Sequence, residues 1–317
     1  MELRHIRYFL AVAEEHNFTR AANRLHIAQP PLSQQIRTLE QEIGTALFVR
    51  TPHGAELTDA GQALYQQLAG LPKQLQHAKD IALKAAKGEI GKLRLGVTGT
   101  AALHPAIPAV IRQYRRRYPE VELTIEEANS LALAEGLAND RLDAAILRPS
   151  DSDPTQLTVQ HFLEEQLVIA LPASHPIARA NETIDVIDLK NEPFILTPRT
   201  LAVSLHDAVV HVCQEAGFEP IVGQPAPQIA SILSMVSAEL GISMLPESMR
   251  QLSVKGVVYR PIKHTAIKVE LAVAHRSLHP SQSAINFAAT VNQQRLAREA
   301  LLAESKAASA LTAPSAP

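Results

Sequence analysis

The sequence lacks the residues on which several classes of protein depend. Its 317 residues include one cysteine, Cys213, so an internal disulfide and a cluster of thiolate ligands are both excluded. The 13 histidines form no helical HExxH motif, and a predicted strand end separates His275 from His279. No apolar run approaches the length of a membrane span. We therefore expect no metal, no cofactor and no membrane partner.

Catalytic motifs are missing too, so no catalytic residue is predicted. Segment 88–93, GEIGKL, has the wrong spacing for a phosphate-binding loop, and it precedes a strand instead of following one. Cys213 lies in a predicted amphipathic helix, where a thiol is a core residue rather than a nucleophile. An unrecognised enzyme remains a competing class, and turnover of its ligand would reveal it.

Length and composition fit a protein with one small and one large domain. With 46% hydrophobic residues, the chain can supply both cores. It opens on a predicted helix instead of a signal peptide, so we expect a cytoplasmic location. Residues 301–317 are rich in alanine and serine and end in APSAP, which predicts a flexible tail.

Residues 18–40, FTRAANRLHIAQPPLSQQIRTLE, predict two short helices joined by a tight turn at 26–28. Thr19 is expected to cap the first helix. Pro30 and Pro31 suit the first turn of the second helix, where no intrahelical donor is needed. The inner face of the second helix is apolar and consists of Leu32, Ile36, Leu39 and Ile43.

The outward side of the second helix carries amide, hydroxyl and guanidinium groups, which can bond base edges or phosphates. Residues 47–57, LFVRTPHGAEL, predict two short strands around a turn, a wing that would lie beside the phosphates or the minor groove. A helix pair alone is also typical of a small bundle, but a pair followed by a wing favours DNA binding. The predicted DNA contacts are Thr19, Arg20, Gln29, Pro30, Ser33, Gln34, Arg37, Arg50 and His53.

Residues 1–58 carry six basic and six acidic side chains, so DNA binding follows from the placement of charges and not from their sum. A neutral domain should bind DNA weakly as a monomer, because affinity grows with each phosphate neutralised. At least two copies are therefore expected.

Residues 59–88 predict a long helix, and Thr58 is expected to cap it. This helix would pair with the same helix of a second copy of the chain. Gly70 and Pro72 predict a bend in it. The alternative is a helix that lies on its own domain. Pairing would set the DNA half-sites about 34 Å apart, or a multiple of that, on an inverted repeat. The heptad seam comprises Leu64, Leu68, Leu71, Leu75, Ala78, Ala82 and Ala85.

Residues 89–300 alternate short apolar strands with helices, which predicts an α/β domain of two similar halves. The halves are subdomain I (about 89–161 and 268–300) and subdomain II (about 162–267). In the first half, the predicted elements are strand 93–97, helix 106–117, strand 121–125, helix 131–139 and strand 143–147. In the second half, they are strand 194–196, helix 203–216, strand 221–223, helix 229–238 and strand 242–245, with crossing strands near 162–171 and 267–275.

A cleft between such halves gathers the carboxyl ends of strands and the amino ends of helices, which attract anions. The loops at 98–100 and 197–200 are therefore candidate ligand loops. Arg148 and Arg199 are candidates to grip a carboxylate. Alternatively, the hydroxyls only cap helices, and the two arginines are solvated or paired with carboxylates.

Residues 1–61 resemble the amino-terminal domain of LysR-type transcriptional regulators. The resembling segments are MELRHIRYFLAVAEEHNFTRAA, QPPLSQQI, LE, IG, LF, Arg50 and LTDAG at 57–61, and they run without a gap. Gln34 stands where close relatives often carry arginine. An amide at that position would favour adenine over guanine.

The resemblance continues more loosely over the periplasmic-binding-protein-like effector domain, and the subgroup that responds to aromatic compounds and their ring-cleavage products is the most similar. Glu239 and Leu240 depart from the small residue or glycine that relatives often carry. Six positions carry over as lining the inducer cleft: Thr100, Ser130, Arg148, Thr197, Leu205 and Ile229. With Gly99 and Arg199 from the two candidate loops, they form the predicted effector set.

The expected fold is α/β, with an all-α winged helix-turn-helix amino-terminal domain, a linker helix and a two-subdomain effector domain. The resemblance implies a homo-oligomeric, tetrameric regulator of transcription that binds an interrupted inverted repeat in double-stranded DNA. It also implies a small anionic inducer, aromatic or carboxylate, and RNA polymerase as a further partner. Besides the unrecognised enzyme, the other alternative to this function is a ligand-binding module without sequence-specific DNA binding.

Overall fold

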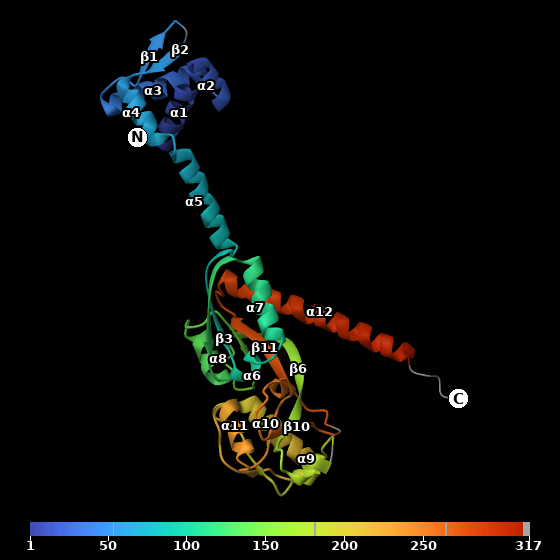
Figure 1. The fold of residues 1–317 in the computed structure, drawn as a ribbon. Coiled ribbons are helices and arrows are strands. Elements are labelled where there is room, and N and C mark those ends of the chain that lie inside the picture. The colour runs from blue at the N-terminus through green and yellow to red at the C-terminus, as the bar shows by residue number, and fades with distance from the viewer. Residues whose placement is uncertain (53, 181, 264, 313–317) are drawn as a thin grey trace. The chain divides into compact units, whose positions relative to one another are not determined.

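The structure is a computed structural model that describes residues 1–52, 54–180, 182–263 and 265–312 (Figure 1). The chain divides into two compact units, one from Met1 to Leu83 and the other from Lys84 onward. Each unit has its own hydrophobic core.

The first unit packs three helices and a two-stranded wing around one core. Phe9 is fully buried, and its ring centroid lies 5.4 Å from that of Phe48 in the wing. Leu32 and Leu39 enter the same core, so the helix pair and the wing are confirmed. The elements are α1 (Leu3–Glu15), α2 (Phe18–Leu25), α3 (Gln29–Ile43), β1 (Phe48–Thr51), β2 (Gly54–Leu57) and α4 (Asp59–Leu68).

Two details of the helix pair differ from the prediction. Asn17 caps α2, because its side-chain oxygen accepts hydrogen bonds from the backbone N–H groups of Thr19 and Arg20. Thr19 is therefore not the cap, since it already lies within the first turn. Ile43, expected to face inward, is 40% exposed because it is the last residue of α3, and Gly44 (φ 85°) then turns the chain away.

The predicted linker helix is broken in two. After α4 ends at Leu68, α5 (Leu71–Ala86) begins with Pro72 in its first turn, which agrees with the expected bend. Leu64 and Leu68 pack against the core of the first unit. No residue of α5 is buried, and Leu75 is 45% exposed. The core of the first unit therefore covers the heptad seam at Leu64 and Leu68, and the seam residues from Leu75 onward are exposed.

The second unit is built on a seven-stranded sheet whose order is β10-β6-β11-β5-β3-β4, with β9 also paired to β6. The strands β3, β4 and β5 are parallel to one another, whereas β6 and β11 are antiparallel and run through both subdomains. A separate parallel pair, β7 (Pro193–Phe194) and β8 (Ile221–Val222), lies in subdomain II. The sheet strands are β3 (Ile90–Val97), β4 (Glu120–Glu127), β5 (Ala144–Leu147), β6 (Leu157–Pro172), β9 (Ser243–Pro246), β10 (Val257–Pro261) and β11 (Lys268–Arg276).

The helices of the second unit divide between the subdomains, as Figure 1 shows. Subdomain I carries α6 (Gly99–Ala102), α7 (Ala106–Arg117), α8 (Ser130–Ala138) and α12 (Gln282–Thr312). Subdomain II carries α9 (Pro176–Ala180), α10 (Val203–Glu215), α11 (Ile229–Ser237) and the 3₁₀ helices η1 (Val186–Leu189) and η2 (Glu247–Gln251). The repeated strand-helix order of the two halves is therefore confirmed.

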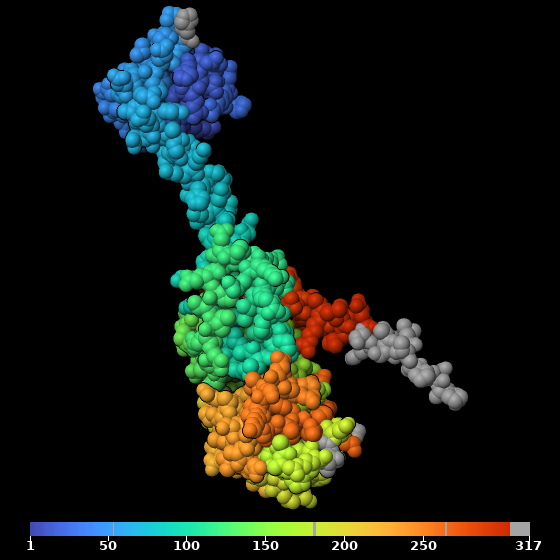
Figure 2. Space-filling view, viewed as in Figure 1, coloured from blue at the N-terminus to red at the C-terminus, as the bar shows by residue number. Residues whose placement is uncertain are grey.

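The last helix, α12, extends beyond the sheet. Phe287 and Val291 are fully buried, whereas Leu301 and Leu302 are 67% and 52% exposed, and the red atoms of this helix project from the rest of the second unit in Figure 2. Residues 301–312 continue this helix where a tail was expected, because alanine, leucine, glutamate and lysine all favour helix. Residues 313–317 lie outside the described residues. None of the described helices combines the length and apolar character needed to cross a bilayer.

Candidate functional site

The outward face of α3 presents two long polar side chains to solvent. Gln34 and Arg37 are exposed and lie nearly one turn apart. Among the described residues, no carboxylate forms an ion pair with Arg37. On α2, by contrast, Arg24 pairs with Glu14 at 2.7 Å. Arg37 therefore keeps an uncompensated charge on the surface of α3.

Ser33 does not point outward as predicted. It is only 8% exposed, and its hydroxyl accepts a hydrogen bond from the Gln29 side-chain nitrogen at 2.8 Å. The reason is its place beside Leu32, at the border between the apolar and the polar face of α3. Ser33 thus orients Gln29 and does not itself form the exposed surface.

The remaining predicted DNA contacts lie on α2, at the start of α3 and in the wing. The Arg50 guanidinium stands 5.0 Å from the Phe18 ring centroid, which ties the wing to α2. Thr19 and Pro30 are exposed. Arg20 is exposed as well, but its guanidinium is 3.8 Å from the Glu15 carboxylate. His53, the remaining member of the set, lies outside the described residues.

A cavity of about 640 Å³ lies between the two subdomains of the second unit. Its wall comes from the ends of strands and the first turns of helices, as the sequence predicts. Seven of the eight residues in the predicted effector set line it: Gly99, Thr100, Ser130, Arg148, Thr197, Leu205 and Ile229. We call this cavity the cleft.

Arg148 lines the cleft, but its charge is already neutralised. It is 4% exposed, and its guanidinium forms an ion pair of 2.9 Å with Glu165, which is equally buried. A further nitrogen donates to the Thr100 hydroxyl at 3.2 Å. Burial lowers the pKa of Arg148, and the Glu165 carboxylate opposes that shift. Gripping an inducer carboxylate, the predicted role of Arg148, would require this pair to open.

Arg199 does not line the cleft, so its predicted place there is wrong. Its guanidinium forms two hydrogen bonds to the Asp207 carboxylate, at 2.7 and 2.8 Å, and its side chain is 63% exposed. These hydrogen bonds raise the pKa of Arg199. The cause is local, since Asp207 lies in the first half of α10 and holds the arginine on the outer surface.

Three helices of eight residues or more begin at the cleft. Asn129 caps α8, whereas neither Ala202 before α10 nor Gln228 before α11 makes a side-chain capping bond. Residues of all three first turns line the cavity. Their amide groups add partial positive charge to a wall whose charged side chains are the paired Arg148 and the carboxylate Glu127.

One hydroxyl in the cleft has no hydrogen-bond partner among the described residues. Thr98 is 6% exposed, and its Oγ1 is buried and unsatisfied. The residue lies in a predicted ligand loop, but the sequence did not distinguish it from Thr100, because only packing shows which hydroxyl stays unpaired. Sequence reasoning also missed Glu165, Ser204 and Gln228, whose places depend on distant segments.

The described part of the chain offers few groups that could bind a metal or act as a nucleophilic thiol. No group of three or more metal-ligating side chains gathers among those residues. Cys213 is fully buried, and burial raises the pKa of its thiol to about 12. It packs in the core of subdomain II, as predicted.

Comparison with known proteins gives the same division of the chain. Residues 3–62 match the bacterial regulatory helix-turn-helix proteins of the lysR family, and residues 86–295 match the LysR substrate binding domain. The transcriptional regulator BudR of Raoultella terrigena is 38% identical over 291 residues, which cover 90% of this chain and 99% of BudR. The regulator AlsR of Bacillus subtilis (strain 168) is 36% identical over 279 residues, covering 87% of this chain and 90% of AlsR.

Solved structures of similar proteins share the fold. Full-length CbnR, complexed with its target DNA, superposes with a TM-score of 0.76 at 25% identity. The superposition covers 93% of this chain and all of that one.

Proposed function

This chain belongs to the LysR family of bacterial DNA-binding transcriptional regulators, and on that premise we propose that a small carboxylate in the cleft controls how it acts on DNA. The observation that carries this proposal is the wall of the cleft. Hydroxyls and the first turns of three helices converge there on one cavity, next to an arginine that is already neutralised.

The carboxylate would lie on amide and hydroxyl groups rather than on an arginine. Helix amino termini stabilise a negative charge, and Thr98 and Thr100 supply hydroxyls beside them. Leu103, Leu205 and Leu252 give the cavity apolar walls. Such walls suit the aromatic ring or hydrocarbon chain of an organic acid.

On DNA, α3 would enter the major groove with Gln34 and Arg37 toward the bases or phosphates, and Arg50 would bring the wing to the backbone. Because the amide of Gln34 matches the adenine edge, we expect adenine at the position that it reads. The supporting observation is the uncompensated charge of Arg37 on the exposed face of α3.

Self-association would place two such helices on an interrupted inverted repeat near the promoter. The open seam of α5 from Leu75 onward is the proposed contact, because isolated apolar side chains on a helix gain stability by pairing. We propose a dimer of this kind within a tetramer. The regulator would act in the cytoplasm, with RNA polymerase as a further partner.

Calorimetric titration with a panel of small aromatic and aliphatic carboxylates tests the cleft. In the Thr100→Val protein, which loses a hydroxyl of the cleft, we expect the affinity of the bound carboxylate to fall about tenfold. Arg199→Gln is the matched control, since Arg199 lies off the cleft, and it should bind like the wild type. Equal affinity in the Thr100→Val protein would reject the cleft as the inducer site.

Footprinting on DNA upstream of the chain's own gene tests the other half of the proposal. Protection of two half-sites about 34 Å apart, or a multiple of that, is the expected result. A ligand-binding module without DNA specificity would protect no site. An enzyme would convert the bound carboxylate, which product analysis after incubation would detect.

A further inference from the structure

The wall of the cleft contains a carboxylate for which a simple organic acid has no use. Glu127, the last residue of β4, lines the cleft, and it is exposed. In the part of the chain that the structure describes, no cation forms an ion pair with Glu127, and no group donates a hydrogen bond to its carboxylate. Its place is set by the parallel ladder, in which Glu127 lies beside Val97 at the end of β3.

Glu127 differs in this respect from the other glutamates of β4, each of which has a counter-charge. The pairs are Glu120–Lys84 at 2.6 Å, Glu122–Lys92 at 3.1 Å and Glu126–Arg141. The same strand therefore carries three glutamates that are paired within the chain and one that faces the cleft unpaired.

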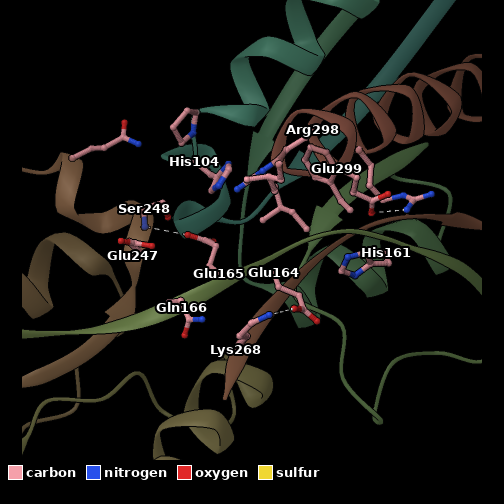
Figure 3. A pocket seen from close by; sticks show the side chains of 16 residues that line it. His104, His161, Glu164, Glu165, Gln166, Glu247, Ser248, Lys268, Arg298 and Glu299 are labelled. Atoms are coloured by element: carbon pink, nitrogen blue, oxygen red, sulfur yellow. Dashed lines mark hydrogen bonds and ion pairs between the residues drawn. The ribbon is translucent and has the colours of Figure 1, made fainter. Parts of the chain in front are cut away.

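Arg148, the cation that lines the cleft, is not available to Glu127. Its guanidinium is paired with Glu165 at 2.9 Å. Figure 3 shows that Glu165 is itself held by Ser248, whose backbone N–H donates a hydrogen bond to the carboxylate at 3.1 Å. Arg148 and Glu165 cancel each other, so the side chains of the cleft keep one uncompensated negative charge.

An unpaired hydroxyl accompanies that charge. Thr98 lines the cleft and is 6% exposed, and its Oγ1 has no hydrogen-bond partner among the described residues. The Glu127 carboxylate lies over the next residue, Gly99, because a Cβ atom placed there would stand 2.8 Å from Glu127 Oε1. Both groups therefore adjoin Gly99. Each of them can accept a hydrogen bond.

The wall that subdomain II contributes has the opposite character. Its lining residues include no charged side chain. It contains the first turns of α10 and α11, and neither Ala202 nor Gln228 caps them with a side chain. Their amide groups favour a negative charge. The cleft thus offers acceptors on one subdomain and donors on the other.

We propose that the inducer is an amino acid, a small carboxylate that also bears an ammonium group, and this inference rests on the proposed function of the cleft. The ammonium would pair with Glu127 and donate a hydrogen bond to Thr98. The carboxylate would accept hydrogen bonds from the amides of α10 and α11. Such a ligand joins the two subdomains, whereas an acid without the ammonium leaves Glu127 unpaired next to a second negative charge.

The test uses four probes: butyrate and its 2-amino, 3-amino and 4-amino derivatives, which differ in the distance between their charges. In calorimetric titrations of the wild-type protein, we expect at least one aminobutyrate to bind at least tenfold more tightly than butyrate. Glu127→Gln should lower the affinity of that aminobutyrate about tenfold and raise the affinity of butyrate about threefold, because it removes an attraction in one case and a repulsion in the other. General damage to the cleft would lower both affinities.

Glu122→Gln is the matched control, since Glu122 is an exposed glutamate of the same strand that does not line the cleft. It should leave both affinities within twofold of the wild type. Gly99→Ala gives a second measurement, because the added methyl group must displace the Glu127 carboxylate. It should weaken the aminobutyrate about threefold more than it weakens butyrate.

Three results would overturn the proposal: butyrate that binds as tightly as every aminobutyrate, a Glu127→Gln protein that binds both kinds of ligand equally less well, or a protein that binds none of the four probes. The first two leave the proposed function standing if Thr100→Val still weakens the binding of butyrate. If Thr100→Val has no effect on any bound probe, the cleft itself is not the site, and the proposed function fails as well.

Discussion

The exposed face of α3 and the wall of the cleft place their functional groups in opposite ways. Gln34 and Arg37 come from one continuous helix and project into solvent, and within the described part of the chain their side chains have no partner that must first be displaced. The cleft collects residues from distant parts of the chain, and its arginine, Arg148, is buried with Glu165. Charged side chains on a surface that binds a polyanion can stay unpaired, because water solvates them. Charged side chains in a buried cavity must pair with opposite charges, and they are then less available to a ligand.

The largest expected effect is that of breaking the buried pair. Glu165→Gln leaves Arg148 buried without a counter-charge, so we expect the free energy of unfolding to fall by about 3 kcal/mol, measured by urea denaturation. Asp207→Asn, which breaks the exposed pair with Arg199, should leave the urea midpoint nearly unchanged. If both substitutions had the same effect, the contrast between the buried and the exposed arginine would be lost.

On the DNA side, Arg37→Ala should weaken binding to the upstream DNA about tenfold in a gel-shift assay, because a charge-assisted contact is lost. The dependence of binding on salt should also decrease by about one released ion. Arg24→Ala removes an arginine that is already paired with Glu14, and it should bind DNA like the wild type. An Arg37→Ala protein with unaltered affinity and salt dependence would contradict the assignment of α3 as the reading helix.

Thr98→Val tests whether a buried hydroxyl of the cleft serves the ligand or the fold, because it replaces that unsatisfied hydroxyl by a methyl group of similar volume. We expect inducer affinity to fall about threefold, while the melting temperature stays the same or rises, since no hydrogen bond of the described structure is lost. Thr98→Ser should retain affinity. A fall in both affinity and melting temperature would indicate that the hydroxyl supports the fold and not the ligand.

The smallest effect is expected from Ser33→Ala. Because Ser33 is nearly buried and only orients Gln29, its loss should weaken DNA binding about twofold and should leave the salt dependence unchanged. The same gel-shift assay over a range of salt concentrations measures both quantities. A loss as large as that of Arg37→Ala would mean that Ser33 contacts DNA directly.

Predictions from the sequence succeeded where a single segment contained its own signal. The apolar spacing in α3, the prolines at its start and the turn before it are local, and the structure confirms them. The alternation of strands and helices in the second unit was equally visible, down to the bounds of α7 (Ala106–Arg117). These features follow from backbone geometry and from the periodicity of side chains along one element.

The errors of prediction arose where several groups compete for one partner, within a short segment or between distant ones. In three cases the deciding contact is local: Asn17 caps α2, Ser33 is buried, and Asp207 pairs with Arg199. Each of these outcomes depends on a few backbone dihedral angles or on a neighbouring turn. The pairing of Arg148 with Glu165 depends on the crossing strand β6. Spacing along the chain carries no information on which of several carboxylates an arginine will meet.

The family, the order of the elements and the loops from which a ligand site could be built all follow from the order of the residues alone. Folding in three dimensions selects which charges stay unpaired among the described residues, such as that of Arg37 on α3, and which buried hydroxyls lack a partner. The physical reason is that secondary structure follows from local periodicity. The availability of a charge or a hydroxyl depends instead on every group that folding brings within hydrogen-bonding distance of it.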